Sequence, residues 1–225
     1  MTDKLPADVA FSGTVRLFPL PNLVMFPHVM QPLHVFEPRF CELLEEAMAT
    51  DRMIGMVLLA PGWERDYEGR PPIEKVACLT RVVTHERRSD GRHNILIQGL
   101  ARVGLVEELP PSKPFREARA ELLTDRNAEI TSRQRALEQQ LVDLCRTADP
   151  HQARSPFIEL LEKDSQLGTI TDLIASALEL TLATRQQLLA ELDVVRRAEL
   201  LIERLEVGLR SAEPLRDFPP PFSVN

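Results

Sequence analysis

Two histidine pairs are the residues whose types and spacing come nearest to a metal site. His85 and His93 stand on either side of a turn signal at residues 89–91, so we expect them to face each other across a hairpin. His28 and His34 flank another short strand. A zinc ion usually takes at least three protein ligands, and the sequence indicates no third ligand beside either pair. We therefore predict no metal site.

Carboxylates and thiols give no catalytic arrangement. Glu107 and Glu108 are adjacent, and adjacent side chains of a strand point to opposite faces, which is poor geometry for acid–base catalysis. The cysteines are odd in number and far apart, so they suggest neither a disulfide framework nor a zinc site. Cys41 and Cys145 fall on apolar faces of predicted helices, where we expect inert core thiols.

The sequence also lacks the motifs of ATP and peptide hydrolysis. A P-loop needs Gly-Lys followed by Ser or Thr, because the lysine contacts the phosphates and the hydroxyl holds magnesium. The residues that precede the four lysines are Asp3, Glu74, Ser112 and Glu162. No serine lies in a Gly-rich turn with a partner lysine, as a Ser-Lys peptidase requires. We predict a chain that is not an enzyme and takes no cofactor.

Composition favours a soluble globular protein, because 44% of the 225 residues are hydrophobic and 27% are charged. The net charge of −7 argues against a nucleic-acid surface, which needs a basic face. Arginines between residues 81 and 92 could form a local basic patch, although a solvated hairpin explains them more simply. The longest apolar run, Met53 to Ala60, is too short to cross a membrane. We expect a cytoplasmic protein without a membrane partner.

Proline usage divides the chain into two halves. Twelve of the 18 prolines lie at or before Pro114, and only Pro150 and Pro156 occur between Phe115 and Glu213. Helix interiors exclude proline, so the first half is predicted to be β and the second half α-helical. We expect an α+β fold, in which a small, partly closed β-barrel with one inserted helix precedes a compact helical bundle.

The stretch from Val15 to Met48 organises the first half. It begins with a short apolar strand, Val15–Phe18, and four prolines then require strands that are short, kinked or at a sheet edge. A helix begins at Pro38, with Glu37 just before it. The further strand candidates are Met53–Ala60, Ile73–Glu86, Ile95–Ile97, Leu100–Val106 and Phe115–Leu123.

Local signals mark several breaks and helix starts. Gly99 separates two of the strand candidates, and glycine there suggests a bulge or a tight bend. Thr184 with Gln187 is a capping box for one helix of the second half. Asp193 can cap the last helix.

The opening stretch resembles the beginning of the Lon N-terminal domain, the substrate-recognising end of Lon protease. The similarity lies in LFPLPNLVMFPHVMQPLHVFEPRF followed by a helix that closes on EEAM. It continues through SDGRHNILIQGLARVGL, which holds a Gly-Leu-x-Arg element at Gly99, Leu100 and Arg102. A Leu-Leu-x-x-Leu-Asp-Val run at Leu188 to Val194 is similar to the helical half, so the resemblance covers residues 13–210.

The resemblance implies a PUA-like pseudo-barrel joined to a helical bundle, and a role in recognising polypeptide substrates. We expect a Lon-type β domain at 13–124, a helical subdomain at 125–212 and an extended, mobile Pro-rich tail at 213–225. Lon protease owes its activity to ATPase and peptidase modules that follow this domain. Because their motifs are missing, we expect the stand-alone recognition domain.

Apolar candidates for polypeptide binding lie in two places. Met25, Phe26, Met30 and Trp63 could line a groove for apolar stretches of unfolded chains, because methionine adapts to varied partners. The alternative is that Met25, Phe26 and Met30 pack inside the barrel. Trp63 lies in a charged loop and is the better candidate for an exposed contact.

Charged candidates stand at the start of the first helix. Glu37 and Arg39 lie where the recognition surface of the resembled family is charged. The alternative for Glu37 is simple complementarity with the helix dipole, which favours an acid near a helix N-terminus.

The main hypothesis is a non-catalytic module that binds unfolded or tagged polypeptides, as an adaptor or chaperone-like holder beside an ATP-dependent protease. Pairing at a sheet edge is one mode it could use. A second hypothesis is RNA binding, because PUA-like barrels can bind RNA, although the acidic charge weighs against it. A third is a small-molecule enzyme with a site between barrel and bundle, for which the sequence offers no convergent titratable groups. The leucine stripe of the last helix leaves a homo-oligomer open.

Overall fold

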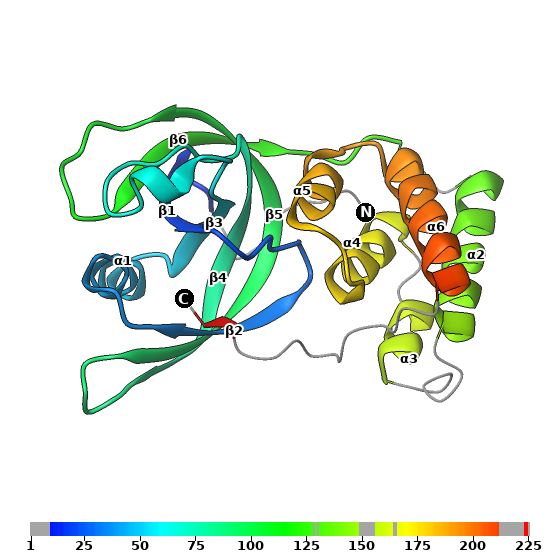
Figure 1. Cartoon of the computed structure of the whole chain (residues 1–225), viewed down its shortest axis with the longest axis horizontal. Helices are drawn as coiled ribbons and strands as arrows, with labels where there is room; N and C mark the ends of the chain where they lie inside the picture. The colour runs from blue at the N-terminus through cyan, green and yellow to red at the C-terminus, as the bar shows by residue number, and fades with distance from the viewer. Residues whose placement is uncertain are drawn as a thin grey trace. The chain divides into compact units, whose positions relative to one another are not determined.

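The computed structural model describes residues 10–127, 129, 131–148, 156–163, 166–211 and 223–224. These residues form two compact units: one ends at Leu123 and includes Ser223–Val224, and the other runs from Thr124 to Ser211. The first unit consists mainly of strands and the second of helices (Figure 1). The predicted α+β fold class is confirmed.

The β unit is a ring of strands. Its elements are β1 (Thr14–Leu20), β2 (Met30–Val35), α1 (Pro38–Ala49), β3 (Met53–Leu58), the 3-10 turn η1 (Trp63–Arg65), β4 (Val76–Arg87), β5 (His93–Glu108), β6 (Arg116–Leu123) and β7 (Ser223–Val224). Among the described residues the strand order is β4-β3-β1-β6-β5-β2-β7, and β4 also pairs with β5. That additional pairing closes β4, β3, β1, β6 and β5 into the expected pseudo-barrel, and β2 and β7 extend from β5.

β1 carries side chains for both sides of the barrel wall. Its inward residues belong to a core formed by Val15, Leu17, Met53, Val57, Ala77, Leu79, Leu100, Val103, Ala118 and Ala120. On the other side, Phe18 stacks on Phe40 of α1 with ring centroids 4.1 Å apart. β1 is thus shared between the barrel core and the inserted helix.

β1 runs two residues beyond its predicted end and contains Pro19. The Leu59 amide donates to the Leu20 carbonyl at 2.9 Å, so Leu20 faces β3 and the alternation turns Pro19 away from β3. On that side, pairing with β6 has already ended at Leu17. The missing N–H of Pro19 therefore costs no ladder hydrogen bond.

β5 is one continuous strand, whereas the sequence predicts two strands separated at Gly99. A Cβ atom on Gly99 would lie 2.0 Å from the carbonyl oxygen of Phe26, in the chain that crosses just before β2. Gly99 also donates to the Val29 carbonyl and accepts from the His28 amide, each at 2.9 Å. Glycine is needed here for close backbone approach and does not end the strand. The predicted bulge is present as a register shift against β4.

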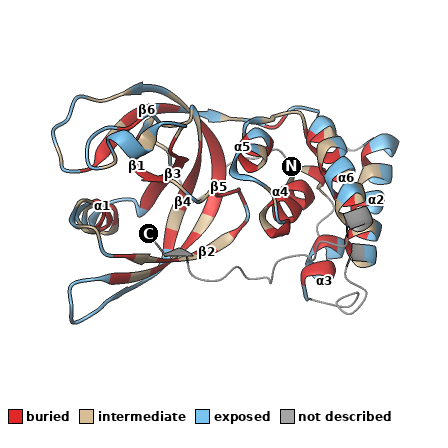
Figure 2. Ribbon diagram, viewed as in Figure 1, coloured by how far each residue is buried: buried red, intermediate tan, exposed pale blue. Residues whose placement is uncertain are grey.

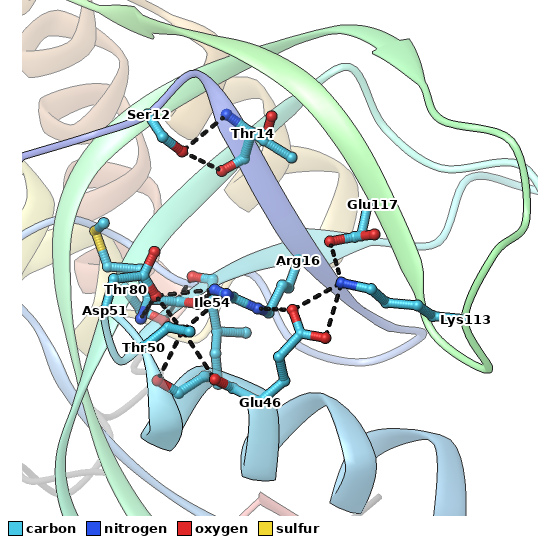
Figure 3. Close-up of polar contacts among 12 residues, drawn as sticks. Ser12, Thr14, Arg16, Glu46, Thr50, Asp51, Ile54, Thr80, Lys113 and Glu117 are labelled. Carbon is cyan, nitrogen blue, oxygen red and sulfur yellow. Dashed lines mark hydrogen bonds and ion pairs between the residues drawn. The ribbon is translucent and has the colours of Figure 1, made fainter.

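Arg16 of β1 ties α1 to the sheet (Figure 3). Its guanidinium donates to Glu46 at 2.9 Å and to Asp51 at 2.8 Å. Glu46 also accepts from Lys113 at 2.8 Å, and Lys113 donates to Glu117 of β6 at 3.0 Å. This network holds the end of α1 against β1 and positions the loop that carries Lys113.

β2 has partners on both sides. It pairs with β5 along its length, and Leu33 and His34 pair in parallel with Ser223–Val224. Pro32 has no N–H, and its carbonyl accepts a hydrogen bond from Gln31 Nε2 at 3.0 Å. Ser223–Val224 is the described part of the Pro-rich tail and is extended; the remaining tail residues lie outside the described residues.

The helical unit contains α2 (Ser132–Ala148), α3 (Pro156–Lys163), α4 (Leu167–Ala177), α5 (Leu182–Ala190) and α6 (Val194–Ser211). α6 packs against α2 and α4. Figure 2 shows α4 buried along nearly its whole length.

Two helix starts test the predicted caps. Asp193 caps α6 as predicted, because its Oδ1 accepts from two amides of the first turn at 3.0 and 3.2 Å. α5 is capped by Thr181, whose Oγ1 accepts from the Thr184 amide at 3.2 Å. The predicted capping box of Thr184 and Gln187 is therefore wrong, because Thr181 offers the same hydroxyl three residues earlier.

One buried arginine holds the helical unit together. Arg197 of α6 is 0% exposed, and Asp125, ahead of α2, is 8% exposed. The two side chains form two parallel hydrogen bonds of 3.0 and 2.5 Å. Arg197 Nε also donates to Thr171 Oγ1 at 2.8 Å and lies 3.8 Å from Asp172 Oδ1, both on α4. A single guanidinium thus joins three segments of the chain.

Candidate functional site

The N-terminus of α1 presents a carboxylate that does not cap the helix. Glu37 occupies the N-cap position in extended conformation, and Pro38 fixes the first turn. The amides of Phe40 and Cys41 donate to the backbone carbonyl of Glu37, at 3.0 and 2.9 Å, and its side chain forms no cap bond. The carboxylate of Glu37 is therefore available to neighbouring side chains.

Those neighbours are Arg39 and Tyr67, and Tyr67 in turn contacts Trp63. We call Glu37, Arg39, Tyr67 and Trp63 the α1 cluster. Glu37 accepts from Arg39 Nε at 3.0 Å and from the Tyr67 hydroxyl at 2.7 Å. Arg39 Nη1 donates to the Tyr67 carbonyl at 3.1 Å, and its guanidinium lies 4.9 Å from the centre of the Tyr67 ring. Trp63 meets Tyr67 edge to face with centroids 5.5 Å apart. The cluster joins the charged loop to the start of α1.

The pKa of Tyr67 provides a direct test of this geometry. Burial and the hydrogen bond to the Glu37 carboxylate raise the pKa of Tyr67 to about 12. Since Tyr67 is the only tyrosine in the chain, tyrosinate absorbance reports on it alone. We expect a midpoint near 12, against about 10 for a free phenol. Glu37→Gln should lower the midpoint, because the anion that opposes ionisation is removed.

The matched control for this titration is Glu64→Gln. Glu64 is exposed in the same loop, so its replacement should leave the midpoint unchanged. Circular dichroism at each pH separates ionisation of the folded protein from alkaline unfolding. A midpoint near 10 in the folded protein would contradict the Tyr67–Glu37 bond.

A cavity of about 210 Å³ lies beside the α1 cluster. Among the described residues that line it, four are cationic: Arg39, Arg70, Lys113 and Arg116. Glu68, which is exposed, is the acidic member of this lining. The lining thus holds four positive side chains and one negative one, and each of the four cations is paired with a carboxylate outside the lining.

Carboxylates behind the cavity wall hold these cations in place. Glu108 binds both Arg70 and Arg116. Arg116 is 8% exposed and also donates from Nη1 to the Pro71 carbonyl at 2.7 Å. Burial and the charge of Arg116 lower the pKa of Arg70, and burial and the charge of Arg39 lower the pKa of Arg116. The guanidiniums thus repel one another across a short distance.

The other apolar candidates lie elsewhere. Met25 and Phe26 are 2% and 0% exposed and belong to the core of the β unit. Met30 is half-buried at the start of β2. Glu37, Arg39 and Trp63, in contrast, come together in the α1 cluster. Sequence analysis missed Tyr67 and the three further cations of the cavity, although the only tyrosine and the only tryptophan share one loop.

The predicted histidine pair does form. His85 Nε2 and His93 Nδ1 are 2.7 Å apart, and the rings stack with centroids 5.0 Å apart. The described residues contain no group of three His, Cys, Asp or Glu side chains placed to hold a metal ion. One ring nitrogen donates to the other, which is a hydrogen bond within the hairpin.

The His85–His93 pair should make stability depend on pH. Burial, with the charges of His85 and Arg87, lowers the pKa of His93. The unfolded chain binds this proton near pH 6.5 and the folded chain only at lower pH, so the free energy of unfolding falls as pH falls below about 6.5. The slope for one proton is at most about 1.4 kcal/mol per pH unit.

Urea denaturation at pH 7 and pH 5 measures this effect. His93→Gln keeps a polar partner for His85 and removes the titration, so its loss of stability between the two pH values should be smaller than that of the wild type. Equal losses in both proteins would contradict the assignment to His93.

The family model of the substrate-binding domain of ATP-dependent protease La (LON) matches residues 14–207. This chain belongs to that family. The predicted resemblance is confirmed, and it covers both the β unit and most of the helical unit. The family model describes the substrate-binding part of the protease, so the chain is a substrate-recognition module of the Lon type.

Curated relatives and solved structures agree with this assignment. The chain is 31% identical to Lon protease 2 of Bdellovibrio bacteriovorus in an alignment of 207 positions that covers 87% of this chain and 25% of the relative. It is 31% identical to the Lon protease of Trichlorobacter lovleyi over 80% of this chain and 22% of that protein. The chain thus spans about a quarter of the length of these relatives.

Two solved Lon N-terminal domains share the fold. The domain of the Mycobacterium avium complex Lon protease superposes with a TM-score of 0.69 at 16% identity, covering 86% of this chain and 98% of that one. The Lon N-terminal domain protein from Xanthomonas campestris gives a TM-score of 0.63 at 22% identity, covering 84% of this chain and 97% of that one.

Among the described residues, no helix has the length and hydropathy needed to cross a bilayer.

Proposed function

We propose that this Lon-type domain binds unfolded or tagged polypeptides without hydrolysing them, as an adaptor or chaperone-like holder for an ATP-dependent protease in the cytoplasm. We assign recognition to the β domain, residues 13–124, and place the helical subdomain at 125–212. The family match over residues 14–207 carries this proposal.

The α1 cluster supports a location for the binding surface. Trp, Tyr and Arg are the residue types that dominate binding energy at protein interfaces, and Trp63, Tyr67 and Arg39 contact one another here. Trp63 and Tyr67 are each partly exposed. Met25 and Phe26 would need the barrel to open before they could contact a substrate. We therefore assign the contact to Trp63, Tyr67 and Arg39.

Binding of a labelled, permanently unfolded polypeptide tests the proposal. Fluorescence anisotropy should show saturable binding to the unfolded chain and none to a folded protein of similar size. Trp63→Ala should weaken binding about tenfold, the effect of truncating one interface hot spot. Val106→Ala is the matched control, because Val106 is a 66% exposed apolar residue of the same unit outside the cluster.

Absence of binding to any unfolded polypeptide would overturn the proposed function. Equal binding by Trp63→Ala and the wild type would place the contact elsewhere and overturn the assignment to the α1 cluster.

A further inference from the structure

The cavity beside the α1 cluster combines an apolar wall with a cationic wall. Phe40 and Phe115 are the aromatic members of the lining; both are at least 95% buried, and the Arg39 guanidinium lies 4.8 Å from the centre of the Phe40 ring. Three prolines, Pro19, Pro111 and Pro114, complete the apolar lining. Lys113 Nζ lies 5.2 Å from the centre of the Phe115 ring, so the two walls meet directly.

The cationic wall is assembled from separate parts of the β unit. Arg39 comes from α1, Arg70 from the loop after η1, Lys113 from the loop before β6 and Arg116 from β6. Arg16 and the carboxylates that bind Lys113 hold its loop in position. Three charged segments and a helix therefore converge on one small volume.

Two of these cations, Arg70 and Arg116, keep hydrogen-bond donors for a ligand, whereas the ammonium of Lys113 already binds Glu46 and Glu117. A guanidinium has five N–H donors. Arg116 donates three of them to described acceptors, Glu108 and the Pro71 carbonyl. In its hydrogen bonds to described residues, Arg70 donates only from Nη2, and the acceptors are Glu108 and the Leu109 carbonyl. An anion in the cavity would take up the remaining donors and relieve the repulsion between Arg70 and Arg116.

Size limits what can enter. Pockets for drug-sized ligands measure about 300–1,000 Å³, and the cavity measures about 210 Å³. A C-terminal residue carries its carboxylate and its side chain on the same carbon, so it can present an anion and an apolar group to adjoining walls. In an internal Asp or Glu the carboxylate ends its own side chain, so the nearest apolar side chain belongs to another residue.

We infer that this cavity binds the free C-terminal carboxylate of a polypeptide whose last residue is apolar, with the carboxylate at Arg70, Lys113 and Arg116 and the side chain against Phe40 and Phe115. This inference rests on the proposed function and names the part of the polypeptide that the domain selects. Arg39 belongs to both the cavity and the α1 cluster, so the upstream residues of the same polypeptide continue onto Tyr67 and Trp63.

Peptide pairs that differ only at the C-terminus test the inference on the full chain. An N-terminally labelled peptide ending in Leu should bind at least about tenfold more tightly as the free acid than as the C-terminal amide, because charge-assisted hydrogen bonds are lost with the anion. The free acid should also bind more tightly than the same peptide ending in Ser. An amidated peptide with an internal Glu-Leu pair should bind as weakly as the plain amide.

Arg70→Gln should bring the ratio of the affinities for the free-acid and the amide peptide close to one. Lys113→Gln is a second variant with the same expectation, and thermal unfolding shows that each variant is folded. Arg92→Gln is the control, because Arg92 is an exposed cation on the β4–β5 hairpin outside the cavity, and its ratio should equal that of the wild type.

The outcomes separate the two proposals. If acid and amide peptides bind equally, or if folded Arg70→Gln and Lys113→Gln keep the full ratio, the inference is overturned while polypeptide binding stands. If the internal Glu-Leu peptide matches the free acid, selection of a C-terminus is overturned. If neither the peptides nor an unfolded protein binds, the proposed function fails as well.

Discussion

Replacing Arg197 by methionine is expected to destabilise the protein by about 3–5 kcal/mol, the usual cost of breaking a buried ion pair. Methionine fills much of the space but leaves the carboxylate of Asp125 buried without the guanidinium that now binds it at 3.0 and 2.5 Å. Thr171 loses its 2.8 Å bond to Arg197 at the same time. Urea denaturation of the full chain, followed by far-ultraviolet circular dichroism, measures the change.

The adjacent residue gives a matched control for this prediction. Arg196→Met makes the same substitution one position earlier, where the side chain is 65% exposed and 3.4 Å from Glu191. An exposed pair of this kind contributes about 0–1 kcal/mol. Equal denaturation midpoints for the two variants would contradict the role of Arg197. Asp125→Asn should also destabilise, because it removes the charge that compensates Arg197.

Gly99→Ala is expected to destabilise the β unit by about 3 kcal/mol, at the upper end of the range for overpacking. The added methyl group would lie 2.0 Å from the Phe26 carbonyl oxygen and 3.0 Å from Pro27 Cα. Both contacts are with backbone, so no side-chain rotation can relieve them. The chain before β2 must move instead, which breaks the two 2.9 Å hydrogen bonds of Gly99 with His28 and Val29.

Gly208→Ala makes the same substitution with the opposite expected sign. Gly208 lies in α6, and a Cβ atom there would have nothing within 4 Å among the described atoms. Alanine is favoured over glycine in a helix by up to about 1 kcal/mol, so this variant should be more stable than the wild type. A wild-type midpoint for Gly99→Ala would show that the crossing chain yields easily.

Features set by neighbouring residues are the ones that the sequence predicts well. The start of α1 follows from Pro38 and Glu37, and the hairpin follows from the turn at Ser89–Gly91, where Gly91 has a φ of +82°. Asp193 caps α6 because its side chain needs only the next turn of the helix. In each case the residues that produce the feature lie within a few positions of it in the sequence.

Features set by distant residues are the ones that the sequence misplaces. In the sequence, Gly99 resembles the end of a strand. The structure shows that glycine is required there by the backbone of Phe26, which is far away in sequence and close in space. The apolar stripe of α6 conceals Arg197, because a buried arginine depends on Asp125 and not on its own helix. Sequence periodicity predicts the helix face on which a residue lies. It does not show which charged side chain of another segment contacts that face.

The same distinction holds for the candidate site. Glu37 and Arg39 are neighbours in sequence, and a lone tryptophan in a charged loop is a visible signal. Arg70, Lys113 and Arg116 are ordinary surface-type residues in separate segments, and only the closure of the barrel makes them lining residues of one cavity. Met25 and Phe26 sit in the same proline-rich stretch as α1 but face the interior.

The pairing of β2 with β5 on one side and β7 on the other has a consequence for solubility. An exposed sheet edge is a template on which extended chains stack, and molecules with such an edge can join strand to strand into aggregates. Here Leu33 and His34 are already paired with Ser223–Val224, and Pro32 cannot donate to a new ladder. β7 is then the outer strand, and its two residues offer few backbone groups to another chain. A domain proposed to handle unfolded polypeptides meets many unpaired strands, and such a short edge strand limits their pairing with it.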